Sequence, residues 1–434
     1  VRRKRPIHRL PREFSQIEIG GEKTFVGAIF EHTLILLIAI LCFGYVLGQS
    51  RAKATARLRG QYLASRPDYY GWFCVLGGLL PFMAVGFVGW FFPVQEPILR
   101  FILPITALFG VSICLFRVNC DLPAQLLVEQ MVRLLLLTSA IIASLATIAI
   151  IVSLLFETGR FFSFDNVSVI EFFFGREWSI QSEAAFGALP LFFGTIFIAF
   201  MAITFAAPIG FFAAIFLSEY ASPTERKIIK PFLELLAGVP TVVYGVFALT
   251  VVAPFMRDIG DGLNALLQPI SGGKDLIPTQ PKNALSASLV LGVMIIPLIT
   301  SLSDDVLRAV PSKMRNAALG LGATQSEMLK HVVLPSAFPG LVGTLLLAVS
   351  RAFGETMIVV MAVGDRAHIT LNPFEDVTTV TAQIVSTLTG DPEFNSAKTL
   401  SAFALGAVLF GVTLAFNILA QWIVHRQEKR FDTA

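Results

Sequence analysis

Long apolar runs constrain this chain more than any other feature of its sequence. Nine of them are long enough to cross about 30 Å of hydrocarbon as α-helices. Of the 434 residues, 55% are hydrophobic and 15% are charged, which excludes a soluble domain of this length. We therefore expect an all-α, polytopic membrane protein. The runs lie at 30–48, 71–92, 98–116, 133–156, 188–217, 233–256, 284–302, 338–363 and 400–424.

Basic residues predict which loops face the cytoplasm, because Lys and Arg are enriched in cytoplasmic loops. Cytoplasmic placement is predicted for 49–70, for the loop around Arg226, Lys227 and Lys230, for 303–337 and for the C-terminus; outer placement follows for 157–187, 257–283 and 364–399. The basic tail 1–24 breaks the rule, because the count of runs places it outside. Either an N-terminal run is not a full crossing, or the tail is absent from the mature chain.

A more polar stretch at 117–132 divides the runs into an N-terminal group and a C-terminal group. We expect an accessory transmembrane module at 25–125, after a tail of doubtful status at 1–24. We expect the functional core at 126–434, because this part holds the long cytoplasmic loop 303–337 and the charges within apolar runs.

The loop 303–337 carries its own folding signals. Thr324 and Glu327 match a capping box, which predicts a short helix from Gln325 to about Val333 that Pro335 ends. Ahead of it, apolar residues recur at helical spacing and two glycines permit a sharp turn. The helical positions are Met314, Ala317, Ala318 and Leu321, and the glycines are Gly320 and Gly322. We expect a helix-turn-helix elbow; a solvated connector is the alternative that the pattern alone leaves open.

Arg351 lies inside the run 338–363, where an arginine costs about 2.5–3.5 kcal/mol. Glu355 follows one helical turn later, so the two side chains form either an ion pair that orients the helix or part of a water-filled path. In the path, Arg351 would present its planar fork of donors to an oxyanion. Glu355 would accept a hydrogen bond from a protonated oxygen, which phosphate keeps near neutral pH and sulfate does not.

The run 233–256 contains Gly238, Val239 and Pro240, which predict a kink that serves as packing or as a hinge. Glu234 lies just before the kink and is a further candidate path residue. Thr241 and Tyr244 either present hydroxyls to the path or cap carbonyls that Pro240 frees. The pattern does not decide between these roles.

Several classes of function are not indicated. A net charge of +3 is ordinary for basic residues on an inner leaflet, and it gives no reason to expect nucleic acid as a partner. The Cys and His residues show no metal-ligand spacing, no cofactor is expected, and no catalytic grouping stands out. The segment Gly272-Gly273-Lys274-Asp275 lacks the Ser or Thr of a phosphate-binding loop. We expect a transporter subunit and no enzyme.

Four segments resemble the permeases of binding-protein-dependent ABC importers. The coupling loop of that family reads Glu-Ala-Ala, three residues, Gly, nine residues, Ile-x-Leu-Pro. Here Ala317, Ala318, Gly322, Leu334 and Pro335 fall in register, Val332 replaces Ile, and Asn316 replaces Glu. The blocks Ser350–Met357, Ser218–Ala221 and Glu234–Gly245 are similar to those of PstC-type permeases of phosphate importers.

The resemblance implies a multi-pass inner-membrane permease with a six-helix core and about three extra N-terminal helices. It implies a sister PstA-type permease, a PstB-type ATPase dimer, a periplasmic PstS-type phosphate-binding protein and membrane lipid as partners. The family's membrane Arg and Glu carry over to Arg351 and Glu355, and Asn316, Ala317, Ala318, Gly322, Leu334 and Pro335 to the contact with the ATPase. The alternatives are an ABC importer for sulfate or molybdate, and an ATP-independent transporter or channel.

Overall fold

The computed structural model describes residues 21–91, 96–165, 167–179, 185–271, 279–390, 393 and 395–431. The expected basic tail lies mostly outside the described residues, and the segment Gly272–Asp275 lies outside them entirely. Within them the chain is helical, apart from the short antiparallel pair β1 (Trp178–Ser179) and β2 (Ala185–Phe186). The all-α prediction is therefore confirmed.

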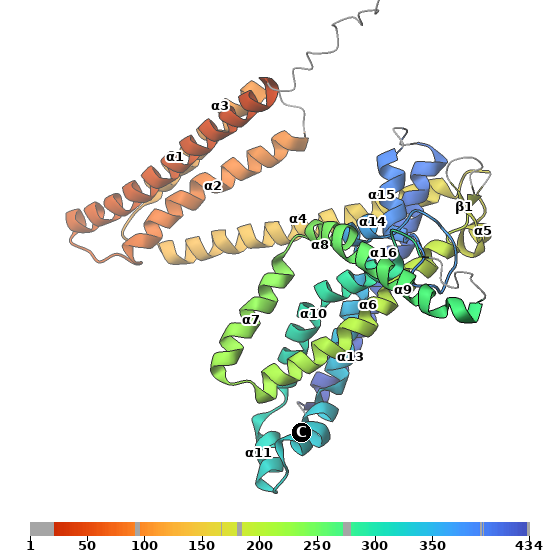
Figure 1. Cartoon of the computed structure of the whole chain (residues 1–434). Helices are drawn as coiled ribbons and strands as arrows, with labels where there is room; N and C mark the ends of the chain where they lie inside the picture. Colours follow the sequence, from red (N-terminus) through yellow and green to blue (C-terminus); the bar gives the residue numbers. More distant parts are fainter. Residues whose placement is uncertain are drawn as a thin grey trace, which may run out of the picture. The chain divides into compact units, whose positions relative to one another are not determined.

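The chain divides into two compact units, Val1–Ile148 and Ala149–Ala434, and helix α4 (Ala124–Phe161) contributes to both. In the first unit, α1 (Gly21–Arg59), α2 (Pro67–Phe91) and α3 (Glu96–Arg117) pack side by side (Figure 1). A Cβ on Gly110 would lie 2.0 Å from the carbonyl oxygen of Gly77, so only glycine permits the close crossing of α2 and α3. The boundary expected between the accessory module and the core stays a prediction.

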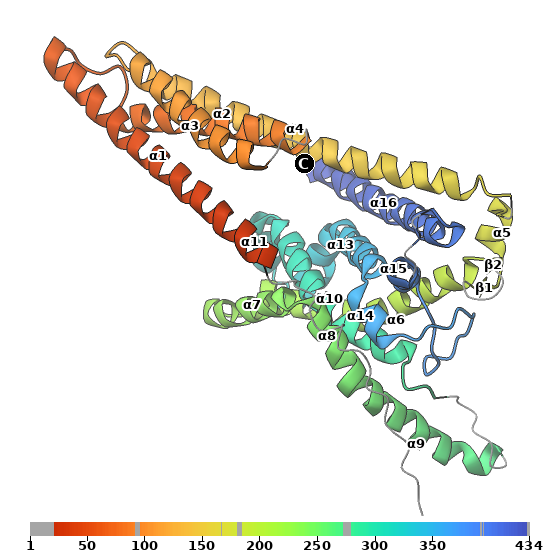
Figure 2. The same cartoon turned by 90° about the horizontal axis from the view of Figure 1, so that it is seen from above.

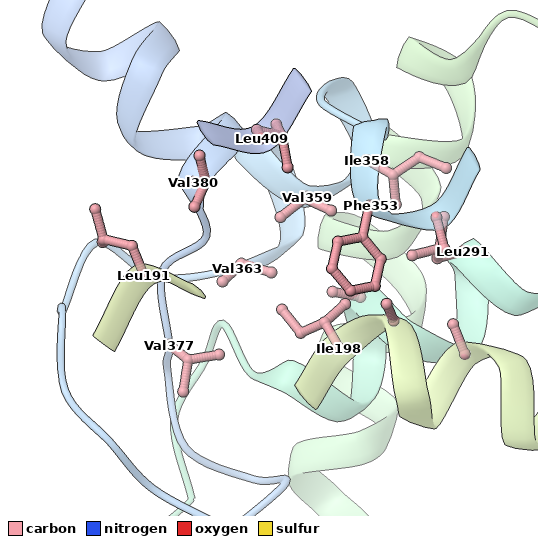
Figure 3. Packing of buried hydrophobic residues seen from close by; sticks show 14 of the residues in the cluster. Leu191, Ile198, Leu291, Phe353, Ile358, Val359, Val363, Val377, Val380 and Leu409 are labelled. Atoms are coloured by element: carbon pink, nitrogen blue, oxygen red, sulfur yellow. The ribbon is translucent and has the colours of Figure 1, made fainter. Parts of the chain in front are cut away.

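The second unit is built on four long helices. Helix α6 (Leu189–Ile215) packs along α10 (Ala284–Ala309), and α13 (Leu334–Gly354) packs along α16 (Ala397–Phe431) (Figure 2). The second unit also contains the short helices α5 (Val169–Phe174), α14 (Met357–Ala362) and α15 (Val380–Gly390). The core draws on many of these elements and includes Leu191, Ile198, Leu291, Phe353, Ile358, Val359 and Val377 (Figure 3).

Eight helices within the described ranges are long and apolar enough to cross a membrane. They are Thr33–Arg59, Pro67–Gly89, Ala124–Phe161, Leu189–Tyr220, Thr241–Leu266, Ala284–Ala309, Gln325–Gly354 and Ala397–Val424. The ninth predicted run, 98–116, corresponds to α3, of which Phe101–Arg117 forms a shorter apolar helix. The expectation of a polytopic membrane protein is confirmed.

The prediction that 233–256 forms a single kinked helix is wrong. Helix α7 (Pro223–Gly238) ends at Gly238, and Val239 and Pro240 are extended. A new helix then begins with α8 (Thr241–Phe247) and continues through the π-helical turn η2 (Ala248–Val252) into α9 (Ala253–Ser271). Because Pro240 has no N–H to give to the carbonyl of Leu236, the helix breaks where a milder kink was expected.

The run 338–363, predicted as one helix, is also divided between two helices, and the first of them begins earlier than predicted. Helix α13 ends at Gly354, Glu355 is extended with φ −68 and ψ 128, and α14 begins at Met357. At the other end, α12 (Gln325–Met328), the π-helical turn η3 (Leu329–Val333) and α13 form one continuous helix. Pro335 therefore does not end the short helix as predicted. It lies inside this continuous helix, two residues after the π-helical turn η3, whose wider hydrogen-bond spacing lets the helix continue past a residue without an N–H.

Candidate functional site

A cavity of about 300 Å³ lies in the second unit, at the break between α7 and α8. Its walls come from α7, α8, α10, α13 and the π-helical turn η1 (Phe216–Tyr220), which ends α6. The residues that line it are Leu217, Lys230, Leu233, Glu234, Ala237, Val239, Thr241, Met294, Pro297, Leu298, Thr300, Ser301, Asp304 and Arg351. Most of the lining surface is apolar, but half of the lining residues are polar or charged, and such a combination is found in ligand sites.

Three predicted path residues, Arg351, Glu234 and Thr241, line this cavity together. Glu234 lies near the end of α7, Thr241 begins α8 after the break at Pro240, and Arg351 comes from α13. Across the described part of the chain, none of the three side chains makes a hydrogen bond or an ion pair. The Arg351 guanidinium thus offers its donors to whatever occupies the cavity.

Tyr244 does not line the cavity. Its hydroxyl donates a hydrogen bond to the carbonyl oxygen of Leu236 at 2.8 Å. In an unbroken helix that carbonyl would accept from the backbone N–H of residue 240, which proline lacks. Of the two roles that the sequence left open for Tyr244, the structure thus shows the capping of a freed carbonyl.

Glu355 lies outside the cavity lining, in the extended segment between α13 and α14. Its backbone carbonyl accepts a hydrogen bond from Thr381 at 3.0 Å. Because α13 ends at Gly354, Glu355 does not continue the helix face of Arg351 as expected. The two side chains form no ion pair in the structure as described.

The sequence motifs did not point to the polar residues at the other end of the cavity. Lys230 served only to mark the cytoplasmic side, and Asp304 fell just beyond the predicted run 284–302. The helix instead extends to Ala309, so Asp304 belongs to a candidate membrane helix and is only 1% exposed. A buried acid in such a helix is itself a signal of a functional or structural partner.

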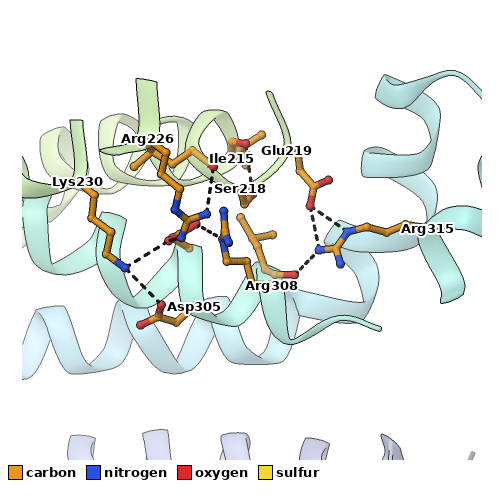
Figure 4. Close-up of polar contacts among 11 residues, drawn as sticks. Ile215, Ser218, Glu219, Arg226, Lys230, Asp305, Arg308 and Arg315 are labelled. Atoms are coloured by element: carbon orange, nitrogen blue, oxygen red, sulfur yellow. Dashed lines mark hydrogen bonds and ion pairs between the residues drawn. The ribbon is translucent and has the colours of Figure 1, made fainter. Parts of the chain in front are cut away.

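Two guanidinium groups satisfy the Asp304 carboxylate (Figure 4). Arg226 of α7 approaches Oδ2 to 2.6 Å, and Arg308 of α10 approaches Oδ1 to 3.0 Å. The Nζ of Lys230 lies farther away, 3.8 Å from Asp304 Oδ2 and 4.0 Å from Asp305 Oδ1. The Arg226 contact joins α7 to α10 at the end of the cavity.

A second ion pair joins the elbow to the end of α6. Arg315 donates to Glu219 through Nη2 at 2.9 Å and Nε at 3.1 Å, and the Glu219 side chain is only 6% exposed (Figure 4). The same guanidinium donates to the carbonyl oxygens of Leu307 and Val310, each at 2.6 Å. Arg315 thereby satisfies carbonyls at the C-terminal end of α10 as well as a buried carboxylate.

The elbow consists of α11 (Ser312–Gly320) and the helix that begins with α12. The capping box is confirmed: Thr324 accepts from the backbone N–H of Glu327, and the Glu327 carboxylate accepts from that of Thr324 at 2.8 Å. Gly322 has φ +91, a conformation that favours glycine. The elbow is therefore a folded hairpin and not a solvated connector.

The elbow has a buried face and an exposed face. Ala318 and Leu334 pack against a buried cluster of Ala214, Leu307, Val310, Met328, Leu329, Val333 and Ala337. Asn316, Ala317 and Pro335 are exposed, and Leu321 is 90% exposed. The predicted coupling residues thus fall on both faces of the elbow.

Family models match both parts of the chain. The model described as "Binding-protein-dependent transport system inner membrane component" matches residues 206–432. A second model, described as "Phosphate ATP-binding cassette transporter", matches residues 34–151, which include most of the module that the sequence analysis left outside its resemblance.

Curated relatives agree with these matches. The chain is 34% identical to the phosphate transport system permease protein PstC of Mesorhizobium japonicum, over 60% of this chain and 79% of the relative. It is 33% identical to PstC of Xylella fastidiosa, over 68% of this chain and 90% of the relative. It is 32% identical to a probable ABC transporter permease protein, YqgH, of Bacillus subtilis, over 68% of this chain and 91% of the relative.

Proposed function

Because this chain belongs to the family of binding-protein-dependent transport system inner membrane components, we propose that its cargo is inorganic phosphate. The chain is a multi-pass permease subunit of an ABC importer in the inner membrane, and ATP hydrolysis resides on a separate chain. The likeness to PstC proteins and the match of residues 34–151 to a phosphate transporter model support phosphate over other anions.

The guanidinium of Arg351 in the cavity wall, which has no partner among the residues that the structure describes, carries the proposal. An unpaired arginine within a membrane helix is costly, so its persistence calls for a ligand or water. Its fork of donors matches the oxygens of a tetrahedral anion, and Thr241 of α8 lines the same cavity. In this role, Arg351 stabilises phosphate while the anion is removed from bulk water.

The elbow is proposed to receive the ATPase. The exposed Asn316, Ala317 and Leu321 belong to its accessible face, and the buried face connects it to α6, α10 and α13. Asn316 replaces the acidic residue of the family motif, so this chain lacks one charge for that contact. Closure of the ATPase on ATP would move the elbow and alternate the access to the cavity.

The proposed partners follow from this role. A periplasmic binding protein and an ATPase are the kinds of partner that the family uses, and a PstS-type phosphate-binding protein and a PstB-type ATPase dimer are proposed here. A PstA-type sister permease would complete the path. Glu355 is proposed to select phosphate over sulfate after a conformational change, because in the present structure it lies outside the cavity lining.

Uptake of radiolabelled phosphate by cells that express the whole transporter tests the proposal. Arg351→Gln should lower uptake per folded transporter by about 100-fold or more, because a charge-assisted contact to the anion is lost. Arg257→Gln is the matched control, since Arg257 lies outside the cavity lining and faces Asp258 at 3.9 Å. Equal uptake by both variants would reject the role of Arg351.

Competition with other anions tests the cargo. Unlabelled sulfate or molybdate should leave phosphate uptake unchanged, whereas inhibition would favour an importer for another oxyanion. Glu355→Gln should reduce the discrimination against sulfate. Unchanged phosphate flux and unchanged discrimination in that variant would remove Glu355 from the proposal.

A further inference from the structure

The cavity follows α10 from Met294 to Asp304, a length of about 15 Å at about 1.5 Å per residue. Asp304 lies near the end of α10 that leads into the elbow, and Lys230 lies beside it. Arg351 lies about 25 Å along α13 from the end of that helix next to the elbow. The two cationic residues of the cavity wall therefore belong to different ends of the cavity.

Lys230 is not needed to satisfy Asp304. Each oxygen of the Asp304 carboxylate already meets a guanidinium, from Arg226 at 2.6 Å and from Arg308 at 3.0 Å. The Nζ of Lys230 is 3.8 Å from Asp304 and 4.0 Å from Asp305, too far for a hydrogen bond to either. Among the residues with described side chains, Lys230 thus has ion-pair neighbours but no acceptor for its three N–H groups.

A second donor lies at the same end of the cavity. Ser301 lines it one turn before Asp304 on α10, and its hydroxyl forms no hydrogen bond with any residue that the structure describes. Glu234 follows Lys230 by one turn of α7 but stays beyond ion-pair distance of it in the described structure. The elbow end of the cavity therefore offers an ammonium group and a hydroxyl group, while its acid, Asp304, is already paired.

We propose that Lys230 and Ser301 form a second oxyanion-binding position at the cytoplasmic end of the cavity, which receives phosphate after Arg351. This inference rests on the proposed function. An anion that leaves Arg351 must remain stabilised until it reaches water, and a loosely paired ammonium provides this stabilisation at small cost to the fold.

Uptake by the whole transporter in cells tests this position. Lys230→Gln should lower the maximum rate per folded transporter about tenfold, while Lys230→Arg, which keeps the charge, should retain most of it. Lys227→Gln is the matched control, because Lys227 is an exposed lysine of α7 outside the cavity lining. Uptake by Lys230→Gln equal to that by Lys227→Gln would overturn the proposal.

Asp305→Asn separates anion binding from ion pairing. It removes one charged neighbour of Lys230 and leaves the cavity lining intact, so uptake should stay near that of the unaltered transporter. A loss as large as that of Lys230→Gln would mean that Lys230 acts through the pair, and would overturn the proposal.

Chemical labelling provides a readout that holds even if Lys230→Gln accumulates poorly. In inside-out vesicles with the whole transporter, inorganic phosphate should slow the reaction of Leu233→Cys with a small anionic thiol reagent, because Leu233 lines the cavity near Lys230 and the change keeps the Lys230 ammonium. It should not slow the reaction of Lys227→Cys. Absence of protection at position 233 would refute the second position, whereas absence of phosphate uptake by the unaltered transporter would reject the proposed function and this inference with it.

Discussion

The charged residues near the elbow differ from those farther along the cavity wall in how their charges are satisfied. Near the elbow, the side chains of Glu219 and of Asp304, which lines the elbow end of the cavity, are buried, and each is held by arginine at hydrogen-bond distance. Farther along the cavity wall, Arg351 and Glu234 have no such partner in the described structure. Both regions lie in the second unit and share α7 and α10.

This difference separates two uses of charge in a membrane protein. A buried charge that is fully paired fixes the relative position of helices, since removing one partner leaves the other uncompensated. An unpaired charge beside a cavity leaves its interactions free for a mobile ligand. The paired region therefore suits the transmission of movement from the elbow, and the unpaired region suits the passage of an anion.

Asp304→Asn should have the largest effect on stability. The change leaves Arg226 and Arg308 without their carboxylate and should destabilise the transporter by about 3 kcal/mol. Glu234→Gln is the same chemical change in the cavity wall, and it should shift stability by less than about 0.5 kcal/mol. Thermal unfolding of the purified transporter in detergent measures both, and equal shifts would contradict the comparison.

Arg315→Ala should have the second-largest effect on stability, a loss of about 2 kcal/mol in the free energy of unfolding. The buried carboxylate of Glu219 and two carbonyls at the end of α10 lose their donor in this variant. The double change Glu219→Arg with Arg315→Glu should regain only part of this stability. A glutamate at position 315 restores the ion pair, but it cannot donate to the carbonyls of Leu307 and Val310.

Lys313→Ala is the control for the elbow pair, because Lys313 is exposed on the same helix. It should leave both stability and uptake unchanged. A double variant no more stable than Arg315→Glu alone would show that the ion pair itself contributes nothing.

Tyr244→Phe should have a smaller effect, about 1 kcal/mol, since one hydrogen bond to the carbonyl of Leu236 is lost. Uptake per folded transporter should stay close to that of the unaltered transporter, because the hydroxyl caps the break and does not line the cavity. A large loss of uptake with unchanged stability would instead place this hydroxyl in the anion path.

The smallest expected effect concerns Glu375, in the predicted outer loop 364–399. A hydrogen bond from Thr370, and further contacts from His368 and Asn372, lower the pKa of Glu375 below its usual value of 4.5. Its contribution to stability is thus present above that pH and is lost as the pH falls through the lowered pKa. Between pH 6 and about 3, Glu375→Gln should lose less thermal stability than the unaltered chain; equal losses would remove this carboxylate as a source of acid sensitivity.

The sequence predicted the elbow well because its signals are local. The capping box of Thr324 and Glu327 and the turn at Gly322 depend on residues a few positions apart, and both are present in the structure. Pro335 was interpreted wrongly, because the π-helical turn before it lets the helix continue into α13.

The cavity was only partly predictable. The motifs pointed to Arg351, Glu234 and Thr241, which meet in the cavity wall, but not to Lys230, Ser301 or Asp304. No short-range pattern connects α7 with the far end of α10, because their contact arises only when two distant helices pack antiparallel. The assumed helix between Arg351 and Glu355 also failed, since the break at Gly354 depends on packing that spacing does not reveal.

The sequence by itself determined that the chain is a helical membrane protein with a folded elbow, and its motifs pointed to a family of importers. These properties follow from hydrophobic length, capping and short motifs, each of which acts within a few helical turns. Only the tertiary structure decided which charges are paired and which face the cavity. That choice depends on helix rotation and on the breaks at Val239-Pro240 and Glu355, where the backbone leaves the helix and re-aims the side chains around it.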